Sequence, residues 1–268
     1  HKVIKISFAI GVLSCASLIL SILISFLYFR PTLPEINLVD ESELQIPLKV
    51  FSKDGILIGE FGEINRRPTE FKDIPQEIYI AFLAAEDDNF FNHQGISYSG
   101  LIRSFIRCLQ STGCQGGGGT ITMQVVRGYL LTPEQTIIRK IKEIFLALEL
   151  EGTNNKEEIF ELYVNRIFLG NRSYGIEAAS NTYFNKSLSE INLNESATIA
   201  AIAQLPSRVN PVKNPRRTLQ RRNWILSRMF LLNYITEDEY KNAISEAVSY
   251  THRRCRRIER CRSRWSPY

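Results

Sequence analysis

The sequence predicts a mainly α fold with one small β-hairpin, preceded by a transmembrane helix. Apolar residues recur at helical spacing over most of the second half of the chain, with Gly, Asn and Pro between the periodic segments. Residues 48–63, LKVFSKDGILIGEFGE, instead read as two short strands around the turn Lys53-Asp54-Gly55. We therefore expect a membrane anchor at 1–30, an extracytoplasmic stalk at 31–49, a folded domain at 50–248 and an atypical Arg/Cys-rich tail at 249–268.

The N-terminal segment is predicted to cross the membrane once. Residues 3–29 are almost wholly apolar, with Lys2 before them, Lys5 near their start and Arg30 after them. This run is long enough for a hydrocarbon core of about 30 Å. A cleaved signal peptide is the alternative, but the run is long and no A-x-A-like site follows it. The flanking lysines place the N-terminus in the cytoplasm. We therefore expect a single-pass type II protein of the inner (cytoplasmic) membrane, with its folded domain on the outer side.

The helices of the domain are predicted from periodicity and capping. A first helix runs from Pro75 to Glu86, because Pro75 suits a first helical position and Ile78, Phe82 and Ala85 share one face. A second, at 132–151, opens with the capping signal Thr-Pro-Glu-Gln. Further helices are predicted at 156–168, 175–184, 195–205, 218–233 and 237–248.

Composition excludes little. The 268 residues are 44% hydrophobic and 23% charged, as in ordinary globular proteins. The net charge of +5 suits nucleic acid, an anionic membrane surface or a phosphorylated substrate, but much of the basic excess lies in the tail from Arg253 to Arg264. The five cysteines contain no CxxC pair, which argues against a zinc site. Cys108 and Cys114 close a short loop and can pair in an oxidising compartment, with two free thiols as the alternative.

Glu86 is the first candidate for acid–base chemistry. It ends an apolar helix and is followed by Asp87 and Asp88, then by aromatic residues and His93. Adjacent acids repel one another, which raises the pKa of a member that is also partly buried. The alternative is a helix end with exposed acids and a surface histidine.

Glu143 is the second candidate. Spacings of three and four place Lys140 and Arg139 beside it on one helix surface. Such a group is either a solvated, salt-bridged face or a cationic cluster that binds a pyrophosphate, with the carboxylate holding a lysine or carrying a divalent metal. Spacing alone does not separate the two.

A glycine run lies between these candidates, in Gln115-Gly-Gly-Gly-Gly-Thr120-Ile-Thr-Met-Gln124. Glycines entering a helix let backbone amides approach an anion. No GK[ST] follows, so the segment is not a P-loop, and a flexible loop is the alternative.

Taken in order, these segments resemble the glycosyltransferase family that polymerises peptidoglycan, found in class A penicillin-binding proteins and in monofunctional transglycosylases. The resemblance covers about residues 50–247. The motifs that carry it are Glu86-Asp87-x-x-Phe90-x-x-His93-x-Gly95, Gly117-Gly-Gly-Thr-Ile-Thr-Met-Gln124 followed by Arg127, Arg139-Lys140-x-x-Glu143, Lys156-x-x-Ile159-x-x-x-Tyr163-x-Asn165 continuing to Tyr183-Phe184, and Glu195-x-Ala197 leading to Leu205-Pro206.

The resemblance implies a lysozyme-like fold and an inverting transfer from a lipid-linked glycan donor to lipid II. Glu86 would be the principal acid/base residue, and Glu143 the second catalytic carboxylate, organising the cationic cluster. It implies no organic cofactor; a Mg²⁺ ion is allowed in the cluster, with its ligands unknown. The residues implied to bind substrate are Asp87, Phe90, His93, Thr120, Gln124, Arg127, Arg139, Lys140, Tyr163 and Asn165. Arg127, Arg139 and Lys140 would neutralise the departing pyrophosphate.

The sequence departs from the family pattern at several positions. Gly119 replaces a usual serine, Gly128 a common asparagine and Asn185 the glycine of a Tyr-Phe-Gly-Lys string. The segment 205–211 is shorter than usual. Neither glutamate is affected, so we expect activity.

Other features indicate the bifunctional class A synthases within the family. These are the hairpin around Lys53 and the string Arg66-Arg67-Pro68. No Ser-x-x-Lys and no Lys-Thr-Gly occurs, so the penicillin-reactive serine site is absent from this sequence. The expectation is a truncated class A protein with an aberrant tail.

The resemblance also sets the expected partners: lipid II, the growing lipid-linked glycan, the membrane and other cell-wall synthesis proteins, and no nucleic acid. Three alternatives stay open. A hydrolase on a lysozyme-like fold has no pyrophosphate to bind, a catalytically silent scaffold has no need of both glutamates, and a nucleic-acid binder rests on the tail alone.

Overall fold

The structure is a computed structural model of the chain. It describes residues 13, 16–17, 20–21, 24–34, 48–54, 57–61, 65–110, 119–131 and 136–246. The segments outside the described residues include the Thr-Pro-Glu-Gln signal, Cys114, Gln115, the glycines at 116–118, the Arg/Cys-rich tail and most of the stalk. The predictions made for these segments therefore stay predictions.

Helices make up most of the described chain, which confirms the mainly α prediction. They are α2 (Gln76–Glu86), α3 (Tyr98–Gln110), α4 (Ile121–Leu130), α5 (Ile137–Thr153), α6 (Lys156–Arg166), α7 (Ile176–Tyr183), α8 (Leu193–Gln204), α9 (Pro215–Leu231) and α10 (Glu237–Ser245). Single 3-10 turns are η1 (Arg30–Thr32), η3 (Phe71–Asp73) and η4 (Leu188–Glu190).

Two short strand pairs complete the described structure. Strands β1 (Leu48–Phe51) and β2 (Leu57–Phe61) pair antiparallel with Leu48 opposite Phe61, which confirms the hairpin. Strands β3 (Asn65–Arg66) and β4 (Ser173–Tyr174) pair in parallel, so the entry to the domain is tied to the segment after α6.

Helices α2 and α7 begin at Gln76 and Ile176, one residue later than predicted. Three other predicted helix starts differ from the structure by two residues or more. Helix α5 begins at Ile137 rather than at residue 132, because the Thr136 side chain accepts the backbone N–H of Arg139 at 3.1 Å. Helix α8 begins two residues before Glu195, which is the third residue of a capping box opened by Asn192. Helix α9 begins at Pro215 rather than at 218, because proline is well suited to the first helical turn.

Helix α3 was not predicted. Its sequence, YSGLIRSFIRCLQ, places apolar residues on one helical side and polar residues on the other. The amphipathic signal for this helix was therefore present in the sequence. Tyr98 and Ile102 on this helix are exposed.

The predicted membrane-spanning segment lies largely outside the described residues. Within the described part of the chain, no helix has the length and apolar character needed to span a membrane. Residues 24–29 are helical and lead into η1. Phe26 meets Phe145 of α5 edge-on, with ring centroids 5.2 Å apart.

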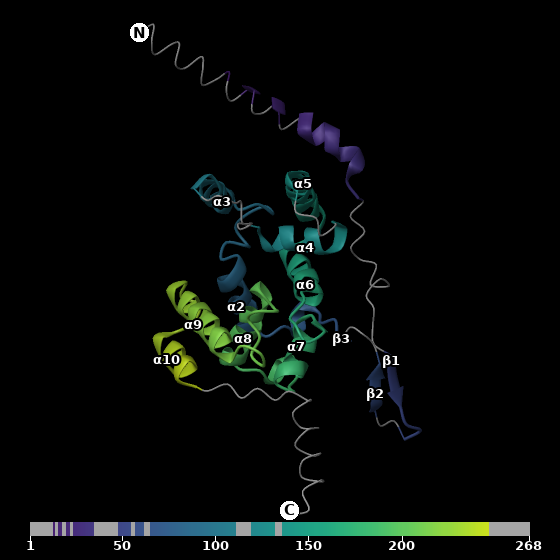
Figure 1. Cartoon of the computed structure of the whole chain (residues 1–268), viewed down its shortest axis with the longest axis vertical. Helices are drawn as coiled ribbons and strands as arrows, with labels where there is room; N and C mark the ends of the chain where they lie inside the picture. Colours follow the sequence, from purple (N-terminus) through teal and green to yellow (C-terminus); the bar gives the residue numbers. More distant parts are fainter. Residues whose placement is uncertain are drawn as a thin grey trace, which may run out of the picture.

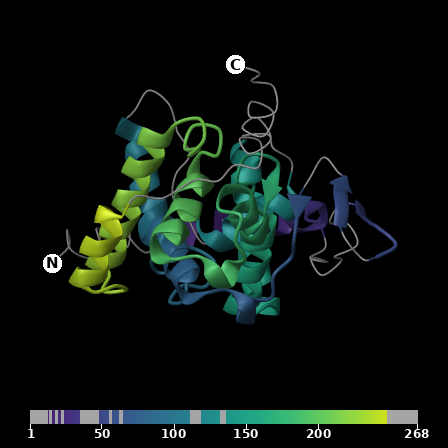
Figure 2. The same ribbon diagram turned by 90° about the horizontal axis from the view of Figure 1, so that it is seen from below.

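The helices pack into one body with the hairpin set apart (Figure 1). Helices α2, α8 and α9 lie against one another and α10 lies on α9, while α4 packs on both α5 and α6. Seen from below, α9 and α10 lie at one side and the hairpin at the other, with α4 to α8 between them (Figure 2).

An aromatic cluster joins α2 to α6 in the core. Phe82, Phe90 and Phe160 are fully buried, and the ring of Phe82 meets those of Phe160 and Tyr163 edge-on at 6.5 and 5.8 Å. Edge-to-face contacts at these distances add to the hydrophobic gain from burial. The cluster fixes the C-terminal end of α2, where the first candidate residue lies.

Candidate active site

Glu86 is the last residue of α2. The helix stops there because Asp87 takes a non-helical conformation while its backbone N–H still bonds Leu83 O at 3.0 Å. Phe82, one turn earlier, is fully buried, which leaves Glu86 partly buried at the edge of the core. The predicted acid–base candidate thus lies at the rim of the core.

The environment of Glu86 suits a proton-transfer group. Burial raises the pKa of its carboxyl, and the nearby charge of Asp87 adds to this. A hydrogen bond from Gln124 Nε2 to Oε2, 3.0 Å long, opposes the rise, as do the charges of Arg221 and Arg127. The structure therefore brings the predicted residues Glu86, Gln124 and Arg127 together.

Tyr163 belongs to the same group. Its side chain is 3% exposed, and among the described residues its hydroxyl has no hydrogen-bond partner. Burial raises the pKa of the phenol well above its usual value, and the charge of Glu86 raises it further. Tyr163 thus carries a neutral O–H without a partner among the described residues, close enough to Glu86 for the charge of that carboxylate to affect its pKa.

Asp87 and His93 build the corner that follows Glu86. Asp87 Oδ2 lies 2.9 Å from His93 Nε2 and accepts the backbone N–H of Ile121 at 3.2 Å, at the start of α4. Phe90, between them, is fully buried, and Lys156 Nζ lies 4.5 Å from its ring centroid. In the structure these predicted substrate-binding residues are engaged with the protein itself.

Thr120 is likewise engaged by the protein. Its hydroxyl donates to Gly95 O at 2.6 Å and accepts the N–H of Met123 at 3.1 Å, so it caps α4. Gly95 has a φ of +77°, and a side chain there would meet Ala147 O at 2.8 Å. The glycine of the first motif is therefore required by this close approach.

Glu143 lies in a second, separate cluster on α5. Its side chain is 1% exposed, with Lys140 Nζ 3.0 Å from Oε2 and Arg139 Nε 3.2 Å from Oε1. The lysine contact is a hydrogen bond, whereas the N–H of Arg139 is not aligned with the carboxylate oxygen, so that contact is an ion pair only. Because Glu143 is buried, the cluster is not a solvated salt-bridged face.

Helix α4 connects the two clusters. It carries Gln124 and Arg127 on the side of Glu86, and it packs on α5. A side chain added at Gly119, just before this helix, would come within 3.7 Å of Lys140 Nζ in ordinary contact. The serine usual at this position in the family would therefore fit.

The described residues offer no preformed magnesium site. They contain no group of three or more His, Cys, Asp or Glu side chains that could hold a metal ion. Both oxygens of Glu143 face cations rather than open coordination positions. We therefore assign no step to Mg²⁺.

The side-chain hydrogen bonds of Asn165 are to neither cluster. Its amide donates to Thr69 O at 2.9 Å and accepts the N–H of Thr69 at 3.0 Å. This pair of bonds ties the segment before η3 to α6. Asn165 thus shapes the domain, and its predicted contact with substrate stays a prediction.

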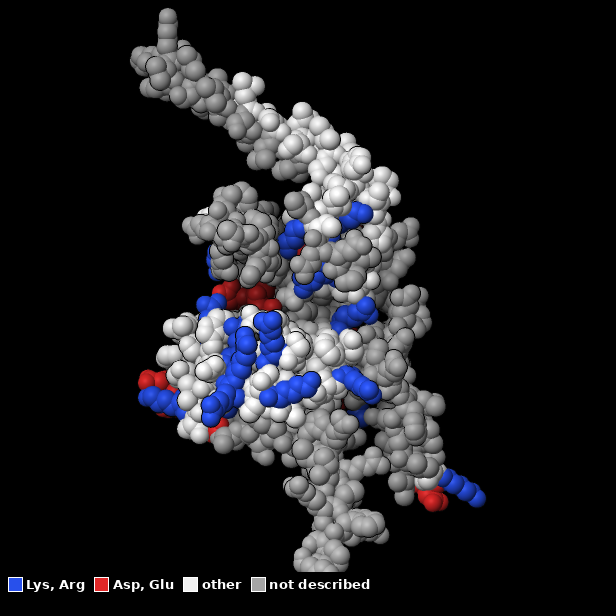
Figure 3. Space-filling view, in the orientation of Figure 1, with Lys and Arg blue, Asp and Glu red and all other residues white. Residues whose placement is uncertain are grey.

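Arg221 of α9 was not predicted as a site residue. Its charge acts on Glu86, and its guanidinium lies 3.9 Å from the ring centroid of Trp224. The available signal was that residues 205–236 contain seven Lys and Arg and no acid, but helical spacing does not tell which of them faces Glu86. In Figure 3 basic side chains gather over α9, below a hollow with acidic side chains at its floor.

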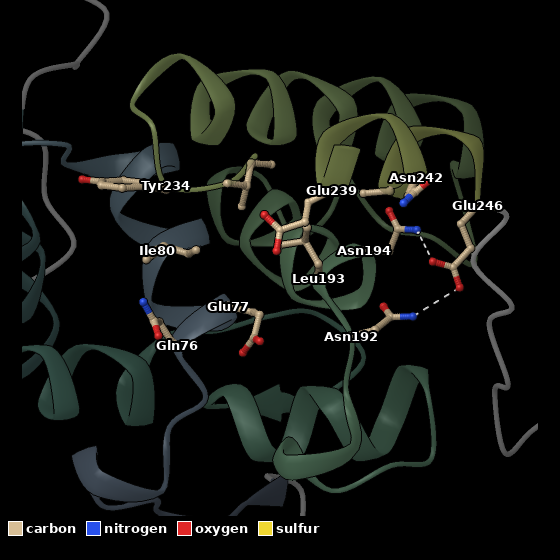
Figure 4. A pocket seen from close by; sticks show the side chains of 12 residues that line it. Gln76, Glu77, Ile80, Asn192, Leu193, Asn194, Tyr234, Glu239, Asn242 and Glu246 are labelled. Atoms are coloured by element: carbon tan, nitrogen blue, oxygen red, sulfur yellow. Dashed lines mark hydrogen bonds between the residues drawn. The ribbon is translucent and has the colours of Figure 1, made fainter. Parts of the chain in front are cut away.

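A separate cavity of about 480 Å³ lies at the other end of α2 (Figure 4). It is bordered by the start of α8 and by α10, and Asn194 and Asn192 there donate to Glu246 at 2.9 and 3.4 Å. None of the predicted site residues lines it. This cavity is therefore distinct from the candidate active site around Glu86.

Comparison with known proteins decides the family. The family model described as Transglycosylase matches residues 54–230 of the chain. The chain belongs to the transglycosylase family. By family it is a peptidoglycan glycosyltransferase of the kind found in class A penicillin-binding proteins.

The relatives of this transglycosylase are much longer proteins. Penicillin-binding protein 1A of Pseudomonas aeruginosa is 49% identical over 89% of this chain and 30% of that protein. Those of Haemophilus influenzae and Escherichia coli are 47% and 41% identical, over 78% and 83% of this chain and 24% and 26% of the relatives. A crystal structure of the Haemophilus influenzae protein covers 78% of this chain and 22% of its own, with 34% identity and a TM-score of 0.48.

One departure of this transglycosylase from the family pattern has a physical explanation. Asn185 has a φ of +59°, in the left-handed region where glycine is favoured and asparagine is the best-tolerated side chain. The substitution therefore keeps the turn after α7.

Proposed function

We propose that this chain polymerises lipid-linked disaccharide-peptide into β-1,4-linked glycan, with lipid II as the acceptor. The observation that carries the proposal is the partly buried carboxylate of Glu86. It accepts a 3.0 Å hydrogen bond from Gln124 Nε2, and burial raises its pKa. A carboxylate in this state is suited to accept a proton from a sugar hydroxyl near neutral pH.

In the proposed step Glu86 removes the proton from the 4-hydroxyl of the acceptor sugar. The hydroxyl oxygen forms a bond with the anomeric carbon of the donor, and the bond from that carbon to the pyrophosphate oxygen breaks with its electron pair. Attack opposite to the leaving group inverts the anomeric centre. The products are a lengthened glycan and undecaprenyl pyrophosphate.

The cationic residues supply charge for the leaving group. Arg139 and Lys140 flank the buried Glu143 at 3.2 and 3.0 Å, and Arg127 extends from α4. Fixed cations stabilise a developing pyrophosphate without reorganisation during the reaction. Glu143 holds the two α5 cations in place, and its part in the proton transfers is a second proposed role.

The proposed substrates place the reaction at the membrane surface. Both carry polyprenyl tails, and the apolar N-terminal run would anchor the chain on the outer side of the inner membrane. Other cell-wall synthesis proteins are proposed partners. A Mg²⁺ requirement remains a prediction from the sequence alone.

Polymerisation of labelled lipid II by the purified chain in detergent tests this function. We expect a product that a muramidase digests, with release of undecaprenyl pyrophosphate and inhibition by moenomycin. Incubation with finished peptidoglycan is the control for the hydrolase alternative. Soluble fragments from that control, or no polymer from folded protein, would contradict the proposal, and the second result would favour a silent scaffold.

A further inference from the structure

We infer that Arg221 is a positioning residue: its guanidinium, fixed against Trp224 of α9, supports Glu86 as the base of the transfer. The inference rests on the proposed function and adds a residue from a helix that contributes none of the predicted site residues. It assigns no substrate contact to Arg221.

The position of Arg221 is set by an aromatic contact. The guanidinium carbon lies 3.9 Å from the ring centroid of Trp224, and this stacking is attractive because the ring face is negative. Among the described residues the Nε atom of Arg221 is buried without a hydrogen-bond partner. The contact with Trp224 therefore holds the charge in place.

A second contact aligns α9 with the Glu86 corner. Arg228 donates to Asp88 Oδ2 at 2.6 Å, only two residues beyond Glu86, and its guanidinium carbon lies 5.9 Å from the same Trp224 ring. Helices α9 and α2 also pack against each other. The same ring thus contacts the cation that fastens the helix and the cation that acts on Glu86.

The charges that act on Glu86 come from two other helices and from its neighbour. Arg221 of α9 and Arg127 of α4 favour the ionised carboxylate, while Asp87 disfavours it, and Tyr163 of α6 is neutral at working pH. Burial lowers the pKa of Arg221, and the charge of Glu86 opposes that change. Because Arg127 is exposed, water and salt screen its charge more than that of half-buried Arg221.

The sign of the effect follows from this arrangement. Loss of the Arg221 charge raises the pKa of Glu86, so a smaller fraction of the enzyme carries an ionised base at a given acidic pH. The acidic limb of kcat/KM against pH then moves to higher pH. Above the new pKa the rate recovers, which distinguishes this role from a structural one, where the rate falls at every pH.

The experiment is the pH profile of lipid II polymerisation for wild type, Arg221→Gln, Arg221→Lys and Arg217→Gln. Arg217 lies one turn earlier on α9 and is exposed, so its variant controls for the loss of one charge. We expect the acidic limb of Arg221→Gln to rise by about one pH unit, a tenfold loss of rate on that limb. Arg221→Lys should restore most of the wild-type profile, and Arg217→Gln should not change it.

An unmoved limb in folded Arg221→Gln, or an equal shift in Arg217→Gln, overturns the inference. If Arg221→Gln does not fold, Trp224→Leu decides, since it keeps the charge but removes its support: a smaller upward shift supports the inference and no shift overturns it. If the wild type makes polymer and the acidic limb of Arg221→Gln does not move, only the role of Arg221 is rejected. No polymer from the wild type rejects the proposed function and the inference with it.

Discussion

The side-chain amide of Gln124 donates a 3.0 Å hydrogen bond to Oε2 of Glu86, which joins α4 to the last residue of α2. The two residues are 38 positions apart in the chain. Of the groups that favour the ionised carboxylate, this bond has the largest effect on its pKa, ahead of Arg221 and Arg127. It also fixes the direction in which the other oxygen of Glu86 points.

Replacing Gln124 with Leu should therefore slow the reaction and change its pH dependence. Without the donor the pKa of Glu86 rises, and the acidic limb of kcat/KM moves to higher pH, with a loss of about tenfold on that limb. Steady-state polymerisation at several pH values measures this. Gln220→Leu, an exposed change on α9, is the control, and equal profiles for the two variants would contradict the role of Gln124.

Glu143→Gln should reduce both activity and stability, although the substitution hardly changes the shape of the side chain. The amide keeps the shape of the side chain but leaves Arg139 and Lys140 without their anion at 3.2 and 3.0 Å. We expect a cost of about 1–3 kcal/mol in unfolding free energy and a loss of activity of about 10²-fold. Urea unfolding and polymerisation rates measure the two effects. Wild-type activity in this variant would show that the cluster does not need Glu143.

Asp87→Ala should destabilise the domain. The change removes the 2.9 Å contact with His93 and leaves the backbone N–H of Ile121 without its acceptor at the start of α4. We expect a loss of about 1–3 kcal/mol in unfolding free energy, measured by urea denaturation. Asp54→Ala in the exposed hairpin turn should leave stability unchanged. A loss of activity with full stability would instead indicate direct substrate binding by Asp87.

Asn185 should behave as a turn residue with positive φ. Asn185→Ala should cost about 1 kcal/mol, because a φ of +59° is unfavourable for alanine. Asn185→Gly should leave stability nearly unchanged. Glycine adopts a positive φ without strain, but its greater conformational entropy in the unfolded chain offsets that gain. Thermal unfolding of the two variants measures the difference, and equal stability of the two would contradict this account of the turn.

Glu86→Gln should stabilise the protein at neutral pH. Burial raises the pKa of Glu86 above its unfolded value, so the folded state binds the proton more tightly. The stability associated with this proton is present at low pH and is lost as pH rises from the unfolded pKa through the folded pKa. The neutral amide has no such loss. If the urea midpoint of Glu86→Gln at pH 7 is lower than that of the wild type, the ionised carboxylate of Glu86 does not destabilise the folded state.

Periodicity and capping signals predicted most of the fold. Helices α2 and α6 and the hairpin follow from local patterns, since the side chains that form them are neighbours in the sequence. The predicted starts of α8 and α9 were too late, because α8 is opened by the N-cap Asn192 and α9 by Pro215 at its first position.

The candidate site was predictable only in part. Glu86 and Glu143 stood out by their neighbours, but the role of Thr120 as a cap depends on a contact with Gly95, 25 residues away. The charge of Arg221 acts on Glu86 only because α9 packs on α2. Such long-range contacts leave no spacing pattern in a single sequence.

The most direct test of the central claim compares the polymerisation rates of Glu86→Gln and Glu77→Gln at saturating lipid II. Glu77 lies on the same helix, at its exposed first turn. Loss of the base should slow Glu86→Gln by about 10³-fold with lipid II binding retained, while Glu77→Gln should equal the wild type. A Glu86→Gln rate within tenfold of the wild type would show that another group takes the proton.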